Sequence, residues 1–163
     1  MKKWLIFALA LCLGAVMVWK SSEKTATLEH ATVSQQKAAQ QETLVDWGVT
    51  MVVKNATPSG CTLEISQLGG KPTGEVECGE DYHVQALTDD GWHNLNMIID
   101  NYAVPAIAYI VSAECPRSFN LNWEYRYGVL LPGTYRIAKE FMDFRGTGDY
   151  DEAYHFSQPF MIE

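Results

Sequence analysis

Basic residues are scarce in this sequence of 163 residues. Lysine and arginine together number 12, against 20 aspartates and glutamates, which gives a formal net charge of −8. Three of the twelve, Lys2, Lys3 and Lys20, flank an N-terminal apolar run, and no carboxylate precedes Ser21. From Ser21 onward, 9 basic side chains therefore accompany 20 acidic ones, a formal charge of −11. A body of this charge repels nucleic acid and anionic headgroups, so we set nucleic-acid binding aside.

Motifs that carry chemistry are also missing. The sequence has no nucleophile elbow of the G-x-S-x-G type and no phosphate-binding glycine loop. His83, His93 and His155 lack the spacing of a metal site, and Cys115 lies in no recognisable protease signature. These absences favour a non-catalytic protein without a cofactor, with a hydrolytic enzyme as a remote alternative.

The first 20 residues predict a membrane segment. Two lysines precede sixteen apolar residues, 4–19, which span about 24 Å as a helix. Residues 16–20 are bulky where a signal peptidase requires small side chains. We therefore expect residues 1–20 to be an uncleaved signal anchor, which makes the chain single-pass with its body outside the cytoplasm. A cleaved signal peptide and a secreted domain are the alternative.

The composition changes sharply after the apolar run. Residues 21–44 are rich in Ser, Thr, Gln, Ala, Lys and Glu and hold few large apolar side chains. Such a segment cannot bury a core, so it predicts a polar stalk or linker. The folded domain is predicted to span residues 45–163.

Alternating apolar and polar residues predict that this domain is all-β. The clearest case is Phe119, Leu121, Trp123 and Tyr125, which alternate with Asn120, Asn122, Glu124 and Arg126 and predict one strand through Arg126. A hairpin is expected at the Asp90-Gly91 turn. About seven short strands separated by turn signals predict an antiparallel β-sandwich.

Residues 130–137, with the sequence LLPGTYRI, predict a structural tyrosine. A Pro-Gly turn precedes Tyr135, whose ring can pack inward while its hydroxyl bonds the upstream backbone. This is the tyrosine corner of immunoglobulin-like sandwiches, and Trp123 is a second candidate for the core. Lys139 falls on the same inward face of the strand, and the sequence offers no reason for it.

The cysteines beyond the apolar run predict one disulfide. If Gly69 and Gly70 form a two-residue hairpin turn, Cys61 lies opposite Cys78 at a non-hydrogen-bonded position, within disulfide range. The same register places Glu64 opposite Glu75. The alternative is a bridge between sheets from Cys61 to Cys115, and either pairing leaves one thiol unpaired.

A candidate binding segment joins the last two predicted strands. Residues 142–154 read MDFRGTGDYDEAY, and we expect them to form one of the longest loops, at an end of the sandwich. Asp143, Asp149 and Asp151 are weak candidates for calcium ligands, against the simpler interpretation as a solvated hairpin. The residues expected to contact a protein or cell-wall glycan partner at the cell surface are Arg145, Asp149, Tyr150 and Tyr154.

Several segments resemble a bacterial immunoglobulin-like domain of secreted or membrane-anchored proteins of Gram-positive bacteria. They are residues 47–60 (WGVTMVVKNATPSG), 68–79 (LGGKPTGEVECG), 123–137 (WEYRYGVLLPGTYRI) and 141–151 (FMDFRGTGDYD). The resemblance implies a β-sandwich and an extracytoplasmic location, with no catalytic residues to carry over. We therefore expect a membrane-tethered binding or envelope-interaction module. The alternative is a sensory or regulatory ectodomain for a small molecule or cell-wall fragment.

Overall fold

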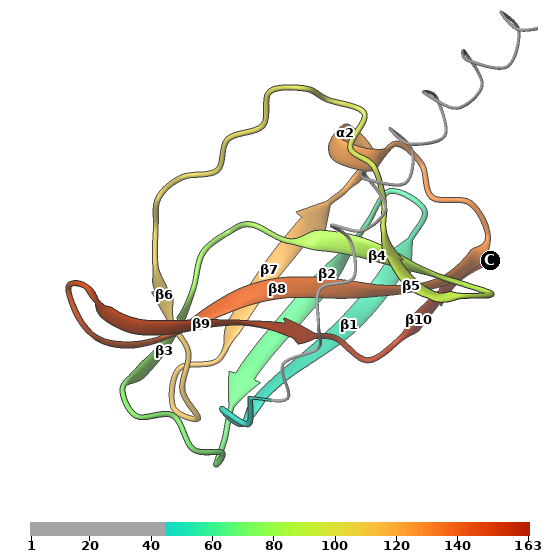
Figure 1. Cartoon of the computed structure of the whole chain (residues 1–163). Coiled ribbons are helices and arrows are strands. Elements are labelled where there is room, and N and C mark those ends of the chain that lie inside the picture. Colours follow the sequence, from blue (N-terminus) through green and yellow to red (C-terminus); the bar gives the residue numbers. More distant parts are fainter. Residues whose placement is uncertain (1–44) are drawn as a thin grey trace, which may run out of the picture. The chain divides into compact units, whose positions relative to one another are not determined.

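The computed structural model describes residues 45–163, which form two antiparallel β-sheets (Figure 1). The predicted signal anchor and stalk lie outside the described residues. The smaller sheet has the order β1-β2-β7 and holds β1 (Val49–Thr57), β2 (Gly60–Gln67) and β7 (Arg117–Asn122). The larger sheet holds β3 (Glu75–Cys78), β4 (His83–Thr88), β5 (Gly91–Asn94), β6 (Tyr109–Ile110), β8 (Gly133–Gly146), β9 (Asp149–Phe156) and β10 (Phe160–Ile162).

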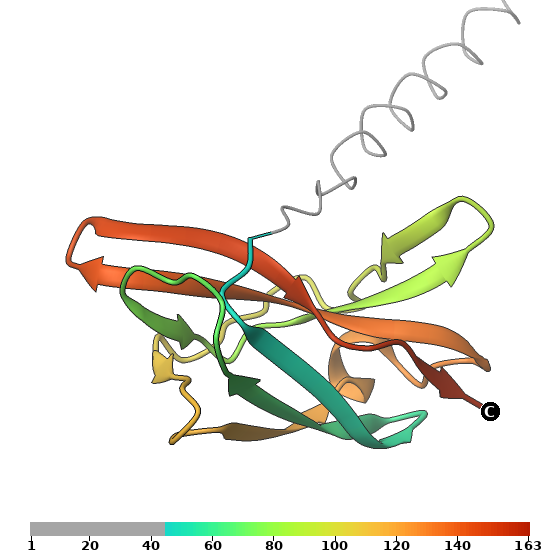
Figure 2. The same cartoon turned by 90° about the horizontal axis from the view of Figure 1, so that it is seen from below.

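The all-β prediction is confirmed, but the described residues form ten strands rather than about seven. Seen from below, the two sheets form separate layers (Figure 2). The predicted hairpin at Asp90 and Gly91 is confirmed, because β4 pairs with β5 and Thr88 lies opposite Gly91.

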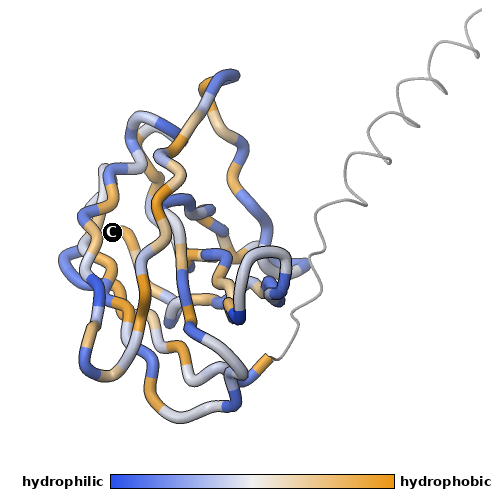
Figure 3. Tube along the Cα trace, turned by 90° about the vertical axis from the view of Figure 1, so that its left-hand side faces the viewer, coloured by the Kyte–Doolittle hydropathy of each residue, from blue (hydrophilic) through white to orange (hydrophobic). Residues whose placement is uncertain are grey.

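The core lies between the facing sides of the two sheets. Leu63 and Ile65 from β2 and Val84, Ile137 and Phe141 from the larger sheet are almost completely buried. Hydropathy alternates along much of the chain, as Figure 3 shows, because successive residues of a strand point to opposite faces. Burying each such side chain contributes about 1.5–3 kcal/mol relative to leaving it exposed.

Tyr135 forms the predicted tyrosine corner. Its hydroxyl donates a hydrogen bond of 2.7 Å to the Leu131 carbonyl, and its ring is buried against the core. Trp123 is also buried, as predicted, and its Nε1 donates to the Pro58 carbonyl at 2.8 Å. The Trp123 ring stacks on Phe160 with 5.8 Å between centroids, which ties β10 to the end of β7.

The predicted strand through Arg126 ends early, at Asn122. The short helix α2 (Glu124–Tyr127) follows, so the alternation fails: Tyr125 is 67% exposed and Arg126 is buried. Local hydrogen bonds explain the change, since the Asn122 side chain accepts from the Glu124 N–H and the Tyr127 N–H donates to the Trp123 carbonyl. These bonds offer the backbone an alternative to the sheet.

The predicted disulfide between Cys61 and Cys78 is wrong. β2 and β3 belong to different sheets, so Cys61 lies opposite Leu121 and Cys78 lies opposite Phe141. All three described cysteines, Cys115 included, are free thiols, so the alternative bridge is absent as well.

Gly69 and Gly70 form a crossing between sheets rather than a hairpin turn. Both have positive φ, 71° and 72°, as the hairpin prediction also required. The crossing lies against the start of β1: a Cβ on Gly70 would come within 2.2 Å of the Gly48 nitrogen, and Lys71 N–H donates to the Asp46 carbonyl. The same glycines therefore suit two different connections. The expected opposition of Glu64 and Glu75 is also absent, because Glu64 pairs with Val52 and Ser118.

We predict that Tyr135→Phe lowers the free energy of unfolding by about 1 kcal/mol, the net value of one hydrogen bond. Urea denaturation of the full chain measures this loss. Tyr125→Phe is the matched control, because that tyrosine is largely exposed, and it should leave stability unchanged. Equal effects of the two substitutions would show that the bond to Leu131 does not stabilise the fold.

We predict that Cys61 resists alkylation in the native protein. Burial raises the pKa of the Cys61 thiol to about 12 and also raises that of Cys78, so neither forms the reactive thiolate at mildly alkaline pH. Mass spectrometry after brief iodoacetamide treatment should find Cys115, which is only half-buried, labelled first. Denatured protein should label at all three without a reductant, and a Cys61–Cys78 peptide would contradict the structure.

Candidate functional site

The predicted binding loop is a paired hairpin. β8 continues to Gly146 and β9 begins at Asp149, so only Thr147 and Gly148 form the turn (Figures 1 and 2). Asp143 lies opposite Asp151 and Phe144 opposite Tyr150 in the ladder. The expectation of a long loop is therefore wrong, because residues 142–154 satisfy each other's backbone groups as two strands.

Arg145 gathers the carboxylates that were candidates for calcium binding. Its Nε lies 2.8 Å from Asp149 Oδ1, and one terminal nitrogen lies 2.9 Å from Asp151 Oδ2 and 3.5 Å from Asp143 Oδ2. The same nitrogen donates to the Thr73 hydroxyl. The positive charge among these carboxylates is thus a guanidinium, and within residues 45–163 no group of three or more His, Cys, Asp or Glu side chains could hold a metal ion. The calcium interpretation is corrected to an ion-pair cluster.

Asp143 is the buried member of this cluster. It accepts hydrogen bonds from the Thr73 N–H and hydroxyl, both at 2.8 Å, and from the Gly74 N–H at 2.6 Å. Burial by itself raises the pKa of Asp143, but these hydrogen bonds and the charge of Arg145 outweigh it and hold the pKa below 3.8. Asp143 therefore binds the segment between β2 and β3, at Thr73 and Gly74, to strand β8.

The hairpin brings only part of the predicted contact set together. Arg145 and Asp149 bind each other. Tyr150, which is 45% exposed, follows Asp149 in the strand and so projects from the opposite face. Tyr154 is partly buried, with its ring 6.2 Å from that of His83. Arg145 and Asp149 therefore have a structural role, and Tyr150 is the member that presents an exposed ring.

A groove that sequence reasoning missed lies where one edge of β8 is interrupted. β4 pairs with β8 up to Ala138, and β3 pairs with β8 from Phe141 onward. β9 occupies the opposite edge at both places, so β3 and β4 follow each other along a single edge. Between them residues 79–82 leave the ladder, and Lys139 and Glu140 have no partner on that edge.

Lys139 stabilises this interruption from inside the sandwich. Its buried ammonium donates to the Gly79 carbonyl at 2.6 Å and to the Asp81 carbonyl at 2.8 Å. Burial lowers the pKa of Lys139, and the negative charge of Asp81 opposes that shift. The lysine that the sequence left unexplained thus satisfies two carbonyls that the ladder does not.

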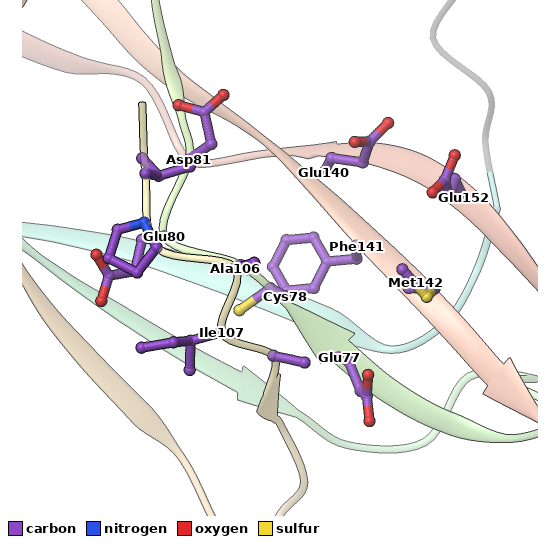
Figure 4. Close-up of a pocket in the computed structure, with 14 residues that line it drawn as sticks. Glu77, Cys78, Glu80, Asp81, Ala106, Ile107, Glu140, Phe141, Met142 and Glu152 are labelled. Carbon is purple, nitrogen blue, oxygen red and sulfur yellow. The ribbon is translucent and has the colours of Figure 1, made fainter. Parts of the chain in front are cut away.

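The groove has a volume of about 300 Å³ and opens on the outer face of the larger sheet (Figure 4). One wall is the segment 104–108, here called the strap, which precedes β6 and reads VPAIA. Ile107 in the strap is 47% exposed. The remaining lining residues are Glu77, Cys78, Gly79, Glu80, Asp81, Glu140, Phe141, Met142 and Glu152.

Met142 lies at the centre of three glutamates. Glu77 on β3 and Glu152 on β9 are its direct partners in the ladder, one on each side, so all three project from one face. Glu140 is two residues away on the same strand and face. In Figure 4, Glu140 and Glu152 lie on one side of Met142 and Glu77 on the other.

The carboxylates of the groove differ in their partners. Asp81 forms an ion pair of 3.0 Å with Arg126, and Glu80 accepts a hydrogen bond of 2.7 Å from the Tyr109 hydroxyl. Glu77, Glu140 and Glu152 make no ion pair with any residue in the described part of the chain. Partial burial raises the pKa of Glu140, and repulsion from Glu152 and Asp81 raises it further.

Two sequence features do mark this site in hindsight. Residues 79–82 (GEDY) interrupt an alternating pattern that resumes at His83, and Lys139 places a charge on an otherwise apolar strand face. Neither feature alone says that the two segments meet. The meeting depends on β3 and β4 sharing one edge of β8, which no local pattern encodes.

The two antiparallel layers, the tyrosine corner and the buried tryptophan define an immunoglobulin-like sandwich. The sequence model described as Bacterial Ig-like domain matches residues 45–160, so the chain belongs to that family. Membership indicates a non-catalytic binding module, as this fold generally provides. No curated protein and no solved structure matches the chain. Across residues 45–163, no helix has the length and apolar character needed to cross a membrane.

We predict that Asp143→Ala lowers the free energy of unfolding by about 2–3 kcal/mol, because three donors lose a charged acceptor. Asp149→Ala, at an exposed position of the same cluster, should cost less than about 1 kcal/mol. Chemical denaturation of the full chain compares the two.

The pH dependence checks the cause of that loss. The folded pKa of Asp143 lies below its ordinary value of 3.8, so its contribution is complete above pH 3.8 and disappears as the pH falls through the folded pKa. The difference between the native chain and Asp143→Ala should therefore shrink in acid. A constant difference would show that packing, not the charge, is responsible.

Proposed function

We propose that the chain is a membrane-tethered, non-catalytic binding module whose Ig-like domain lies outside the cytoplasm and contacts a partner through the groove beside Met142. Family membership supports the binding role. The location rests on the apolar run at residues 4–19 and its flanking lysines, which favour a signal anchor.

The observation that carries the binding role is the groove itself. Glu77, Glu140, Met142 and Glu152 stand on the paired strands β3, β8 and β9, so this side of the groove is rigid, and the apolar strap lies opposite it just before β6. A volume of about 300 Å³ is at the lower end of ligand cavities, which suits one or two inserted side chains better than a whole large ligand. A protein segment is therefore the best-fitting partner at the cell surface.

The hairpin contributes a second contact in this proposal. Tyr150 presents a partly exposed ring on the same face of the sheet as Met142, because it pairs with Phe144 two residues further along β8. An aromatic ring with a polar tip is well suited to protein and glycan surfaces. A sensory ectodomain that takes a cell-wall fragment would use the same face, so it differs from the main proposal in what is bound.

We predict that a photo-reactive amino acid placed at Ile107 captures a partner on intact cells. The matched control is Val52 on β1 of the smaller sheet, which is 40% exposed against 47% for Ile107. The full chain should form an adduct after Ile107→benzoylphenylalanine and not after Val52→benzoylphenylalanine. A reagent that cannot cross membranes should label the same chain, and the chain should sediment with membranes.

Three results would contradict parts of this proposal. Equal adducts from both positions would show capture without a specific surface. Adducts from Tyr150→benzoylphenylalanine alone would move the contact from the groove to the hairpin. Absence of labelling by the impermeant reagent would place the domain inside the cell.

A further inference from the structure

The groove combines an apolar wall with a charge of a single sign. Its strap carries five apolar residues, and Met142 adds a thioether. No lysine or arginine is among its lining residues. Lys139 lies beneath, but its ammonium points into the sandwich toward Gly79 and Asp81 carbonyls.

The three glutamates around Met142 determine where a bound cation could lie. Glu77 and Glu152 are on strands either side of β8, so their backbones are about 10 Å apart. Glu140 is the diagonal neighbour of Glu152, at about 7–8 Å between Cα atoms. A single cation above Met142 can approach all three carboxylates, which have no cationic partner among residues 45–163.

Resting on the proposed function, we propose that the groove binds a lysine or arginine side chain of a partner polypeptide, with an adjacent apolar side chain against the strap. The aliphatic stem of such a residue lies on Met142 while its charged head reaches the glutamates. The apolar neighbour buries Ile107, which is half-exposed in the isolated chain.

The charge of the chain favours a basic partner over a second copy of the chain as the occupant of the groove. From Ser21 onward the chain has a formal charge of −11, so two copies repel each other as they approach. A basic partner is attracted by the same field, and its association should slow as salt is added. The three glutamates then select the position at which the cation settles.

The test is fluorescence anisotropy of a dye-labelled, end-blocked pentapeptide, Val-Lys-Val-Lys-Val, with the full chain in neutral detergent. The double variant Glu140→Gln with Glu152→Gln should weaken binding about tenfold, since each partly exposed pair supplies about a threefold effect. The matched control, Asp89→Asn with Glu163→Gln, makes the same change in net charge away from the groove and should weaken binding less than about twofold.

Two further comparisons separate charge from apolar contact. Val-Gln-Val-Gln-Val should not bind, and Ser-Lys-Ser-Lys-Ser should bind more weakly than the parent peptide. Ile107→Ser should reduce binding of the valine peptide and leave that of the serine peptide unchanged. The Glu140→Gln variant should melt no lower than the native chain, because it removes repulsion from Glu152, so its lost binding does not reflect unfolding.

Equal weakening by the two double variants would overturn the proposal, because it would show that the peptide responds to the overall negative charge of the chain and not to the groove. Competition by spermidine as strong as that by the peptide, with no effect of Ile107→Ser, would assign the groove to a free polyamine. Self-association lost on Glu140→Gln would assign it to a second copy. A peptide that does not bind, together with continued capture of a partner on cells by Ile107→benzoylphenylalanine, is a different result. That result would contradict the basic-peptide ligand but leave the proposed binding function intact.

Discussion

The buried ammonium of Lys139 is the contact on which the larger sheet depends. A lysine inside a sandwich loses its hydration, and it is retained only where the protein supplies equivalent acceptors. The carbonyls of Gly79 and Asp81 do so, because residues 79–82 have left the ladder and no strand amide reaches them. The buried ammonium of Lys139 thus finds the hydrogen-bond acceptors it needs in carbonyls that the break at residues 79–82 leaves without a strand partner. Without the interruption the buried ammonium would lose these two acceptors.

The groove follows from the same break. Because β3 and β4 are separated by residues 79–82, one edge of β8 is open at Lys139 and Glu140, and the strap passes nearby without pairing with β8. Glu140 loses its neighbour on that edge and faces the opening. A feature required for satisfying backbone groups in the interior therefore creates a recess on the exterior.

Much of the fold could be predicted from local sequence patterns, and the connections between sheets could not. The alternation at Phe119 and Leu121 and the turn before Tyr135 act over a few residues, so they specify strands and the tyrosine corner directly. Gly69 and Gly70 adopt positive φ in a hairpin and in a crossing alike, so their sequence does not decide which sheet receives β3. The groove is formed by four separate segments of the chain, and of its features the sequence showed only the break in alternation at residues 79–82 and the unexplained Lys139.

The position of β8 constrains how this domain is made. Its first half pairs with β4 and β10 and its second half with β3 and β9, so one strand joins segments from both ends of the domain. A chain emerging N-terminus first exposes β3 and β4 before their shared partner has been synthesised. Until residues 133–146 arrive, those strands have unpaired edges of the kind that promote aggregation. The larger sheet must therefore assemble late, as a nearly complete chain. A domain truncated before β8 would keep the sheet of β1, β2 and β7, but only the separate β3–β6 and β4–β5 pairs of the larger sheet.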